Sequence, residues 1–309
     1  MFIPTDHFIL FLLRARLKFN QEYKYLIKNP KWLLMFVFGR FIFIRFLVSY
    51  FYKPPALEKF SNKPSLFEKL NIEDVVQSLS QDGLYLGINL NQKTIQEIIN
   101  FAESTKFYAN YDRELTFHIS ELKNLQVRHN NNFIIGDYLD GAKLCPTINQ
   151  LASDPKLLEI AALYLKSEPK FVETKLYWSF VTKADFEDRM KLGAVLFHHD
   201  PIDYHSLKFY FYLTDVDLFS GPHVCVRGSH KNKKIAHQFS LLIGREDRDI
   251  TDYYGDENVV TVCEKAGFGF AEDPFCFHKA ITPSHKERLV LQITFTLNKY
   301  RVGQTEIIW

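Results

Sequence analysis

Two stretches far apart in the chain set the strongest constraint on its fold: a Phe-His-His-Asp stretch that ends at Asp200, and a Phe-His pair that ends at His278. In an extended strand, successive side chains point to opposite faces, so His198 and Asp200 share one face and His199 points away. A second imidazole from a remote strand would complete a set of two histidines and one carboxylate. Such a set suits non-haem Fe(II) with open coordination positions. We therefore expect the fold to bring His278 beside His198 and Asp200 as metal ligands and catalytic residues.

Arg288 lies ten residues after His278, at the start of an apolar run. A guanidinium can hold a carboxylate through two parallel hydrogen bonds, so Arg288 is a candidate anchor for an anionic cosubstrate. His199 competes as a ligand only if the strand bulges, and His285 sits in a turn too close to Arg288. A surface ion pair for the first two residues and a core position for His278 are the alternatives without a metal.

The order of these features resembles a known family. The chain carries His-x-Asp, a Tyr- and Phe-rich strand, Gly-Pro-His-Val-Cys-Val-Arg-Gly-Ser-His at 221–230, and then a histidine with an arginine ten residues later. This order resembles the phytanoyl-CoA dioxygenase family of iron- and 2-oxoglutarate-dependent oxygenases, over roughly residues 71–298. The resemblance implies Fe(II) on His198, Asp200 and His278, 2-oxoglutarate on Arg288, and O2 as oxidant. The reaction it implies is hydroxylation of a C–H bond with release of succinate and CO2.

The second contact to 2-oxoglutarate is open, because Ala280 stands where relatives can carry a helpful hydroxyl. The candidates are Lys208, Tyr210 and Thr214. Alternation along residues 208–214 places them on one face with Tyr212, and we assign that face to the pocket beside the metal. The intervening Phe and Leu side chains would pack against helices. For Tyr212, a core position with a hydrogen bond to backbone is the alternative.

Charge divides the chain into two parts. Residues 1–64 carry eleven Lys and Arg against three Asp and Glu, whereas the rest carries 27 against 33. We expect 1–64 to be a basic, apolar, membrane-associating helical segment that ends in a Pro-rich linker, and 65–309 to be the dioxygenase domain. The basic residues of the first part interleave with apolar runs, so anionic lipid is the expected partner and nucleic acid is not.

Residues 8–52 are the expected membrane contact. Residues 8–19 indicate a basic amphipathic helix, and 32–52 is long enough to span a bilayer. Arg40 and Arg45 would each cost about 2.5–3.5 kcal/mol at the centre of a span, which favours a helix in the interface with both arginines reaching lipid phosphates. A helical pair packed on the domain or on a sister subunit is the alternative, and a span comes third. Oligomerisation stays open.

Cysteine spacing indicates a cytoplasmic protein, and the basic, apolar N-terminal segment indicates that it is peripheral or monotopic on a membrane. The four cysteines show no paired spacing, which favours reduced thiols over disulfides or zinc. They are Cys145, Cys225, Cys263 and Cys276.

The strand pattern predicts an α+β fold with a double-stranded β-helix (jelly-roll) core of about eight strands and helices packed on one sheet. The expected strands are 171–181, 194–199, 208–214, 223–226, 259–262, 267–271, 277–281 and 288–297. Helices are expected from about Ile72, over 92–103 and over 151–166. A charged run between 229 and 258 is either a lid or binding loop or a merely solvated loop, and the sequence does not decide between them.

The expected substrate is an amphipathic small molecule, such as a fatty-acyl chain, a polyprenyl or terpenoid lipid, or a lipid-linked sugar. Two other interpretations compete with an enzyme. One is a non-catalytic jelly-roll module that binds a lipid or glycan at a membrane, and the other is a membrane-tethered scaffold.

Overall fold

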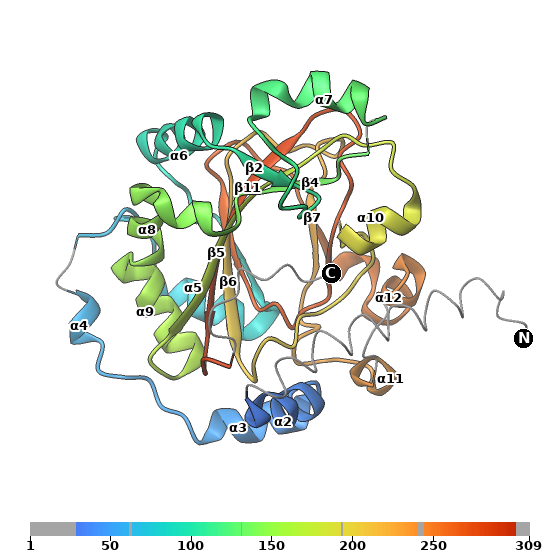
Figure 1. Ribbon diagram of the computed structural model, residues 1–309. Helices are drawn as coiled ribbons and strands as arrows, with labels where there is room; N and C mark the ends of the chain where they lie inside the picture. The colour runs from blue at the N-terminus through green and yellow to red at the C-terminus, as the bar shows by residue number, and fades with distance from the viewer. Residues whose placement is uncertain (1–28, 62–63, 131, 193, 240–243, 301–309) are drawn as a thin grey trace, which may run out of the picture.

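The computed structural model describes residues 29–61, 64–130, 132–192, 194–239 and 244–300 (Figure 1). The α-helices are α2 (Pro30–Phe38), α3 (Ile42–Tyr50), α4 (Glu58–Ser61), α5 (Ile72–Asp82), α6 (Gln92–Ser104), α7 (Leu122–Arg128), α8 (Pro146–Ala152), α9 (Pro155–Leu165), α10 (Phe186–Leu192), α11 (Ile235–Gln238) and α12 (Asp247–Tyr254). Short 3-10 turns cover Ile119–Glu121, Leu139–Leu144 and Asp256–Asn258. The strands are β1 (Leu84–Leu86), β2 (Phe107–Ala109), β3 (Thr116–Phe117), β4 (Ile135–Asp137), β5 (Lys170–Ser179), β6 (Ser206–Tyr212), β7 (His223–Val226), β8 (Val259–Val262), β9 (Gly269–Glu272), β10 (His278–Ala280) and β11 (Arg288–Thr296).

The strands form two antiparallel sheets. The large sheet has the order β1-β9-β6-β11-β5-β4-β2-β3, and the small sheet has the order β10-β7-β8. All pairings between the described strands are antiparallel. Together with the helices they make a mixed α+β, jelly-roll-like fold, as the strand pattern predicts.

Alternation along the central strand β11 gives the large sheet its two faces. Leu289, Leu291 and Ile293 are fully buried in the main hydrophobic core. The helices α5, α6, α8 and α9 lie on this face (Figure 1) and contribute the other half of the core. Phe209 and Phe211 of β6 join them, as predicted. The alternate side chains of β11 therefore point to the opposite face, where the cavity described below lies.

Local signals place several elements correctly. The helix predicted over 92–103 forms as α6, and the Asn91 side chain caps its start by accepting a hydrogen bond from the Thr94 N–H. The helix predicted over 151–166 is confirmed as α9, and only its first residues are wrong, because Leu151 and Ala152 belong to the end of α8. Asp154 caps α9, and Pro155 occupies its first turn, where a missing N–H is harmless.

The strand predicted at 194–199 is also wrong as a regular element. Only two isolated bridges form there, one from Phe197 to Arg245 and one from His198 to His278. The charged run after Ser229 folds into α11 and α12, and Arg245 just before α12 supplies the first bridge. This insertion therefore contacts the segment that carries the metal-site residues.

The described N-terminal helices pack on the domain. Trp32 and Met35 of α2 are buried, and so is Arg45 of α3. Arg45 donates to the Asp203 carbonyl at 2.9 Å and lies 3.8 Å from the Asp273 carboxylate. The expectation that Arg45 reaches lipid phosphates is therefore wrong, because its charge is taken up inside the protein.

Arg40 is also turned inward. Its guanidinium donates to the Phe36 and Val37 carbonyls and so caps the end of α2. Among the described residues, no helix has both the length and the apolar character needed to cross a membrane. The amphipathic helix predicted over 8–19 lies outside the described residues.

Candidate metal centre

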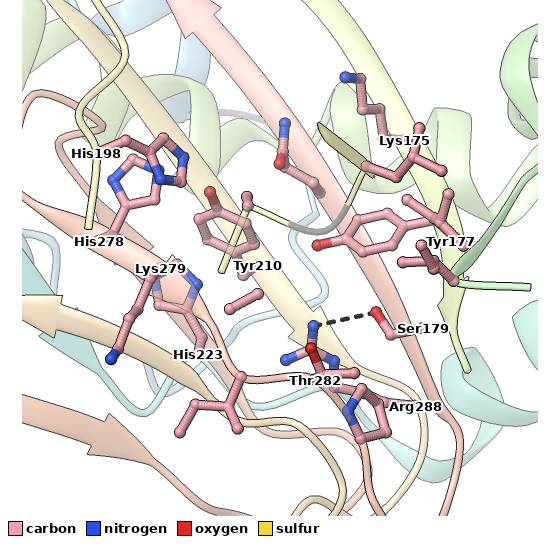
Figure 2. A pocket seen from close by; sticks show the side chains of 18 of the residues that line it. Lys175, Tyr177, Ser179, His198, Tyr210, His223, His278, Lys279, Thr282 and Arg288 are labelled. Atoms are coloured by element: carbon pink, nitrogen blue, oxygen red, sulfur yellow. Dashed lines mark hydrogen bonds between the residues drawn. The ribbon is translucent and has the colours of Figure 1, made fainter. Parts of the chain in front are cut away.

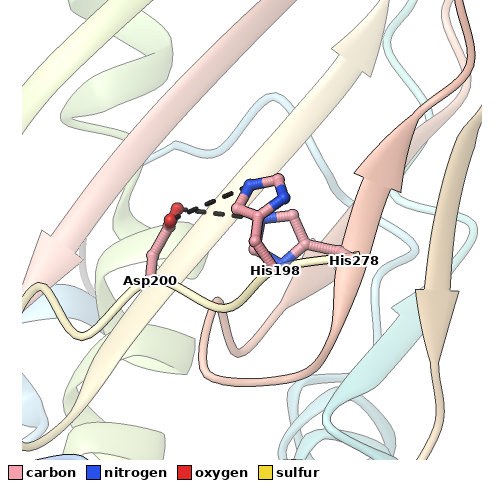
Figure 3. A group of neighbouring side chains, drawn as sticks. All are labelled: His198, Asp200 and His278. Atoms are coloured by element: carbon pink, nitrogen blue, oxygen red, sulfur yellow. Dashed lines mark ion pairs between the residues drawn. The ribbon is translucent and has the colours of Figure 1, made fainter. Parts of the chain in front are cut away.

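The structure brings His198, Asp200 and His278 together (Figure 3). One ligand atom from each lies within 4.8 Å of the others. The Nε2 atoms of His198 and His278 are 4.0 and 3.7 Å from the two Asp200 oxygens. The backbones of His198 and His278 exchange hydrogen bonds of 2.9 and 2.8 Å, so the isolated bridge sets the two rings side by side.

Both imidazoles are oriented for coordination through Nε2. The Nδ1 atom of His198 lies 2.9 Å from the Leu196 carbonyl, and that of His278 lies 3.0 Å from the Cys276 carbonyl. A carbonyl only accepts hydrogen bonds, so each Nδ1 carries the proton and each Nε2 keeps its lone pair. Such second contacts fix the ring of a metal-binding histidine.

Ionisation of the three groups also suits a cation. Burial and the neighbouring His278 lower the pKa of His198 to about 4, so this imidazole is neutral at pH 7. Burial opposes ionisation of Asp200, but Lys208 and the two imidazoles hold its pKa well below the usual range. Burial also works against a charge on His278, yet Glu272 and Asp200 outweigh it and raise its pKa. The excess negative charge that favours a proton on His278 would equally favour a metal ion.

Glu272, for which the sequence predicts no role at the site, supports the centre. Glu272 of β9 is fully buried, with Oε1 3.1 Å from His278 Nδ1 and Oε2 2.5 Å from His223 Nε2. Its carboxylate therefore bridges a candidate ligand and a second histidine. The only sequence signal was a lone acidic residue in the apolar run Gly-Phe-Gly-Phe-Ala-Glu, and that signal does not identify a partner.

A cavity of about 180 Å³ opens beside the three side chains (Figure 2). It is lined by Tyr111, Ile134, Ile135, Lys175, Tyr177, Ser179, Leu192, Ala194, His198, Asp200, Lys208, Tyr210, His223, His278, Lys279, Ala280, Ile281, Thr282, Pro283, Arg288 and Gln292. Lys208 and Tyr210 are therefore at the cavity, as predicted from alternation along β6. The Lys208 ammonium lies 2.6 Å from Asp200 Oδ2.

Arg288 lies at the cavity wall with donors to spare. The side chain is buried, with only 2% of the residue exposed. It donates to the Gly221 carbonyl and, over 3.2 Å, to the Ser179 hydroxyl. Its Nε has no partner, and no carboxylate pairs with it in the described part of the chain. A buried cation of this kind is a ready site for a carboxylate.

Two predicted pocket residues lie elsewhere. The Thr214 hydroxyl accepts from the Leu289 N–H at 3.1 Å and is outside the cavity lining, so it offers no cosubstrate contact there. The Tyr212 hydroxyl donates to the Val262 carbonyl and accepts from the His223 N–H, both at 3.0 Å. This is the backbone-bonded core position that the sequence left open.

The competing histidines are turned away from the centre. The His199 ring packs edge-on against Phe275 and Phe277. His285 is exposed and lies against Phe219, with Nδ1 2.8 Å from the Ser284 hydroxyl. Neither belongs to the group of side chains that could hold a metal.

The Gly-Ser-His segment has a structural role. Gly228 has φ +72°, which favours glycine. The Ser229 hydroxyl donates to the Val226 carbonyl and accepts from the Phe277 N–H, so it holds the residue that precedes His278. The His230 Nδ1 lies 3.6 Å from the Cys276 sulfur.

Comparisons with known proteins bear on the fold. No family model matches the sequence, and no curated protein matches it. Among solved structures, EctD from S. alaskensis, crystallised with 2-oxoglutarate and 5-hydroxyectoine, aligns with a TM-score of 0.50 and 14% identity over 82% of this chain and 85% of that chain. The epimerase SnoN, in complex with Fe3+, alpha ketoglutarate and nogalamycin RO, aligns with a TM-score of 0.49 and 15% identity over 73% of this chain and 83% of that chain. At such identities the likeness shows the fold alone, and the chain shares the α+β, jelly-roll-like fold of EctD.

Proposed function

We propose that the protein is an Fe(II)- and 2-oxoglutarate-dependent dioxygenase, similar to the phytanoyl-CoA dioxygenase family, that hydroxylates an amphipathic substrate. One observation carries the proposal: the His198, Asp200 and His278 set shares a cavity with the buried cation of Arg288. Bound iron would supply the oxidising chemistry, in which 2-oxoglutarate, O2 and a C–H bond give succinate, CO2 and an alcohol.

The protein's own groups have separate tasks in this proposal. The two Nε2 atoms and one oxygen of Asp200 would hold the metal, which leaves positions open for cosubstrate and O2. Lys208 donates to Oδ2 of Asp200 and would keep the carboxylate ionised and fixed in place. Arg288 would take the far carboxylate of 2-oxoglutarate with the donors that its contacts to Gly221 and Ser179 leave free.

The proposed substrate is a lipid or a lipid-linked sugar. Support comes from the mixed character of the cavity wall, which combines apolar Ile134, Leu192 and Ile281 with polar groups such as Lys175 and Tyr177. A wall of this kind suits a molecule with an apolar part and a polar part.

The test is iron-dependent succinate formation by the purified full-length protein supplied with 2-oxoglutarate and O2. We expect Asp200→Ala and His278→Ala to abolish Fe(II) binding in an anaerobic titration and to abolish turnover. His285→Ala removes an exposed imidazole from outside the centre and should change neither Fe(II) binding nor turnover. Full turnover in Asp200→Ala would refute the ligand assignment. Absence of Fe(II) binding by the wild type would favour a non-catalytic jelly-roll module that binds a lipid or glycan.

A further inference from the structure

The outer faces of α2 and α3 carry many exposed apolar side chains. Trp32, Met35 and Arg45 face the domain, whereas the opposite sides of the two helices are exposed. The exposed set is Leu33, Leu34, Val37, Phe38, Phe43, Phe46, Leu47, Tyr50 and Phe51. Soluble domains seldom expose so many large apolar groups together unless the surface binds something.

Helix α11 extends the same surface. The Ile42 N–H donates to the Gln238 side chain at 3.0 Å, and the rings of Phe41 and Phe239 are 5.2 Å apart. This contact places α11 beside the helical pair (Figure 1), and Ile235 and Phe239 at its two ends are exposed. We call the exposed apolar side chains of α2, α3, Phe51, Ile235 and Phe239 the apolar face.

The chain segments that carry the apolar face bear charge of one sign. Residues 29–57 and 231–239 contain no Asp or Glu. Lys31 and Lys53, both exposed, flank the helical pair. Lys231 and Lys234, also exposed, lie just before α11. Apolar side chains bordered by lysines match the interior and the anionic head groups of a bilayer. Two copies of this surface related by symmetry would bring lysines of like charge together.

We propose that the apolar face docks onto a bilayer that contains anionic phospholipid, with the aromatic side chains in the interface and the lysines at the head groups. The inward-facing Arg45 fixes which side of α3 is presented, because its contacts to Asp203 and Asp273 hold α3 on the domain. The arrangement is monotopic: the two helices lie on the membrane and do not cross it. This docking is independent of the proposed reaction, since it needs neither metal nor cosubstrate.

Flotation of the full-length protein with phosphatidylcholine vesicles, with and without phosphatidylglycerol, tests the proposal. We expect binding only when phosphatidylglycerol is present. Phe43→Asp combined with Phe46→Asp, at positions 66% and 65% exposed, should reduce binding about tenfold or more. Lys53→Ala should weaken binding about fivefold. Val127→Asp is the matched control, because Val127 is 80% exposed on α7 at the opposite side of the molecule in Figure 1.

Thermal melting separates docking from folding, since Phe43 and Phe46 are exposed and their replacement should leave the melting temperature unchanged. Leu34→Asp on α2 gives an independent loss of binding if the double variant fails to fold. Failure of the wild-type protein to bind phosphatidylglycerol vesicles would overturn the proposal. So would a well-folded double variant that binds as the wild type does. A wild-type dimer that the double variant converts to monomer, with no vesicle binding by either, would assign the apolar face to a second copy of the chain.

Discussion

Replacement of Arg288 by methionine tests the proposed cosubstrate site most directly. Methionine keeps much of the length and apolar stem of the side chain but removes all five N–H donors and the charge. In the structure, two of those donors serve Gly221 and Ser179, and no carboxylate pairs with the guanidinium in the described part of the chain. The remaining donors can form two charge-assisted hydrogen bonds to a carboxylate, each contributing about 1.5–3 kcal/mol.

Loss of both bonds sets the expected size of the effect. At least about 3 kcal/mol of binding free energy disappears, which weakens the Kd for 2-oxoglutarate or N-oxalylglycine about a hundredfold. At an N-oxalylglycine concentration of about 100 times the wild-type Kd, the wild type gains about 2.7 kcal/mol of stability, whereas the variant gains about 0.4 kcal/mol. For a chain of this size, these gains correspond to rises in Tm of about 5 °C and about 1 °C.

The assay is thermal unfolding of the metal-loaded protein with increasing N-oxalylglycine, compared with the unliganded protein. Arg248→Met is the matched control, because Arg248 lies on the surface of α12 with its side chain 91% exposed. It should keep the full wild-type rise. Arg288→Lys should show a rise in Tm between those of Arg288→Met and the wild type, because lysine keeps the charge but loses the planar fork of the guanidinium. If Arg288→Met keeps the wild-type rise, the carboxylate is held elsewhere and the reasoning fails.

Four further predictions concern other charged groups. Lys208→Met should weaken Fe(II) binding about 10–100-fold in an anaerobic titration, because Asp200 loses the ammonium that lies 2.6 Å from its Oδ2; unchanged affinity would remove Lys208 from the centre. Arg45→Met should lower the free energy of unfolding by about 3–5 kcal/mol in urea denaturation, since it leaves the buried Asp273 without its counter-charge. Arg40→Met, which removes only two bonds at the end of α2, should cost no more than about 1–3 kcal/mol. Asp137→Asn should stabilise the protein at about pH 7.5 but not at about pH 4, as measured by the same denaturation.

The Asp137 prediction follows from the direction of its pKa shift. Burial raises the pKa of Asp137 from 3.8 to about 6, so the folded state binds the proton more tightly than the unfolded chain does. Stability is therefore lost as the pH rises from about 4 past 6, and the loss reaches about 3 kcal/mol at most. Asparagine is never charged, and its oxygen can still accept the Leu139 N–H that Asp137 accepts at 2.6 Å. A variant no more stable than the wild type at about pH 7.5 would contradict this account.

The alternation of side chains along extended backbone explains which residues of the site could be predicted from the sequence. His198 and Asp200 share a side because two residues in extended backbone always do, and this holds although no regular strand forms there. His278 was predicted from its spacing to Arg288, and both lie where antiparallel strands begin. Alternation likewise separated Lys208 and Tyr210 from the buried Phe209 and its neighbours.

Side chains that reach the site only through strand register could not be predicted from alternation along a single strand. Glu272 reaches the centre because β9 pairs with β6, which sets it opposite Lys208. Ser179 contacts Arg288 because β5 pairs with β11 in a register that sets the two residues opposite each other. A shift of one residue in either pairing would turn these side chains to the helix-covered face, and nothing local to either strand specifies the register.

Arg45 shows that partners distant in the sequence can change the role expected for a residue. On a hydropathy scale, an arginine in an apolar run is expected to reach water or lipid phosphate. Its partners here, the Asp203 carbonyl and the Asp273 carboxylate, lie more than 150 residues along the chain, and Phe275 lies under its guanidinium at 3.9 Å. Asp203 follows the metal-site Asp200 by three residues, and Phe275 precedes His278 by three. The same arginine that holds α3 on the domain therefore contacts both segments that build the candidate centre, so the outer helices and the centre share one buried attachment.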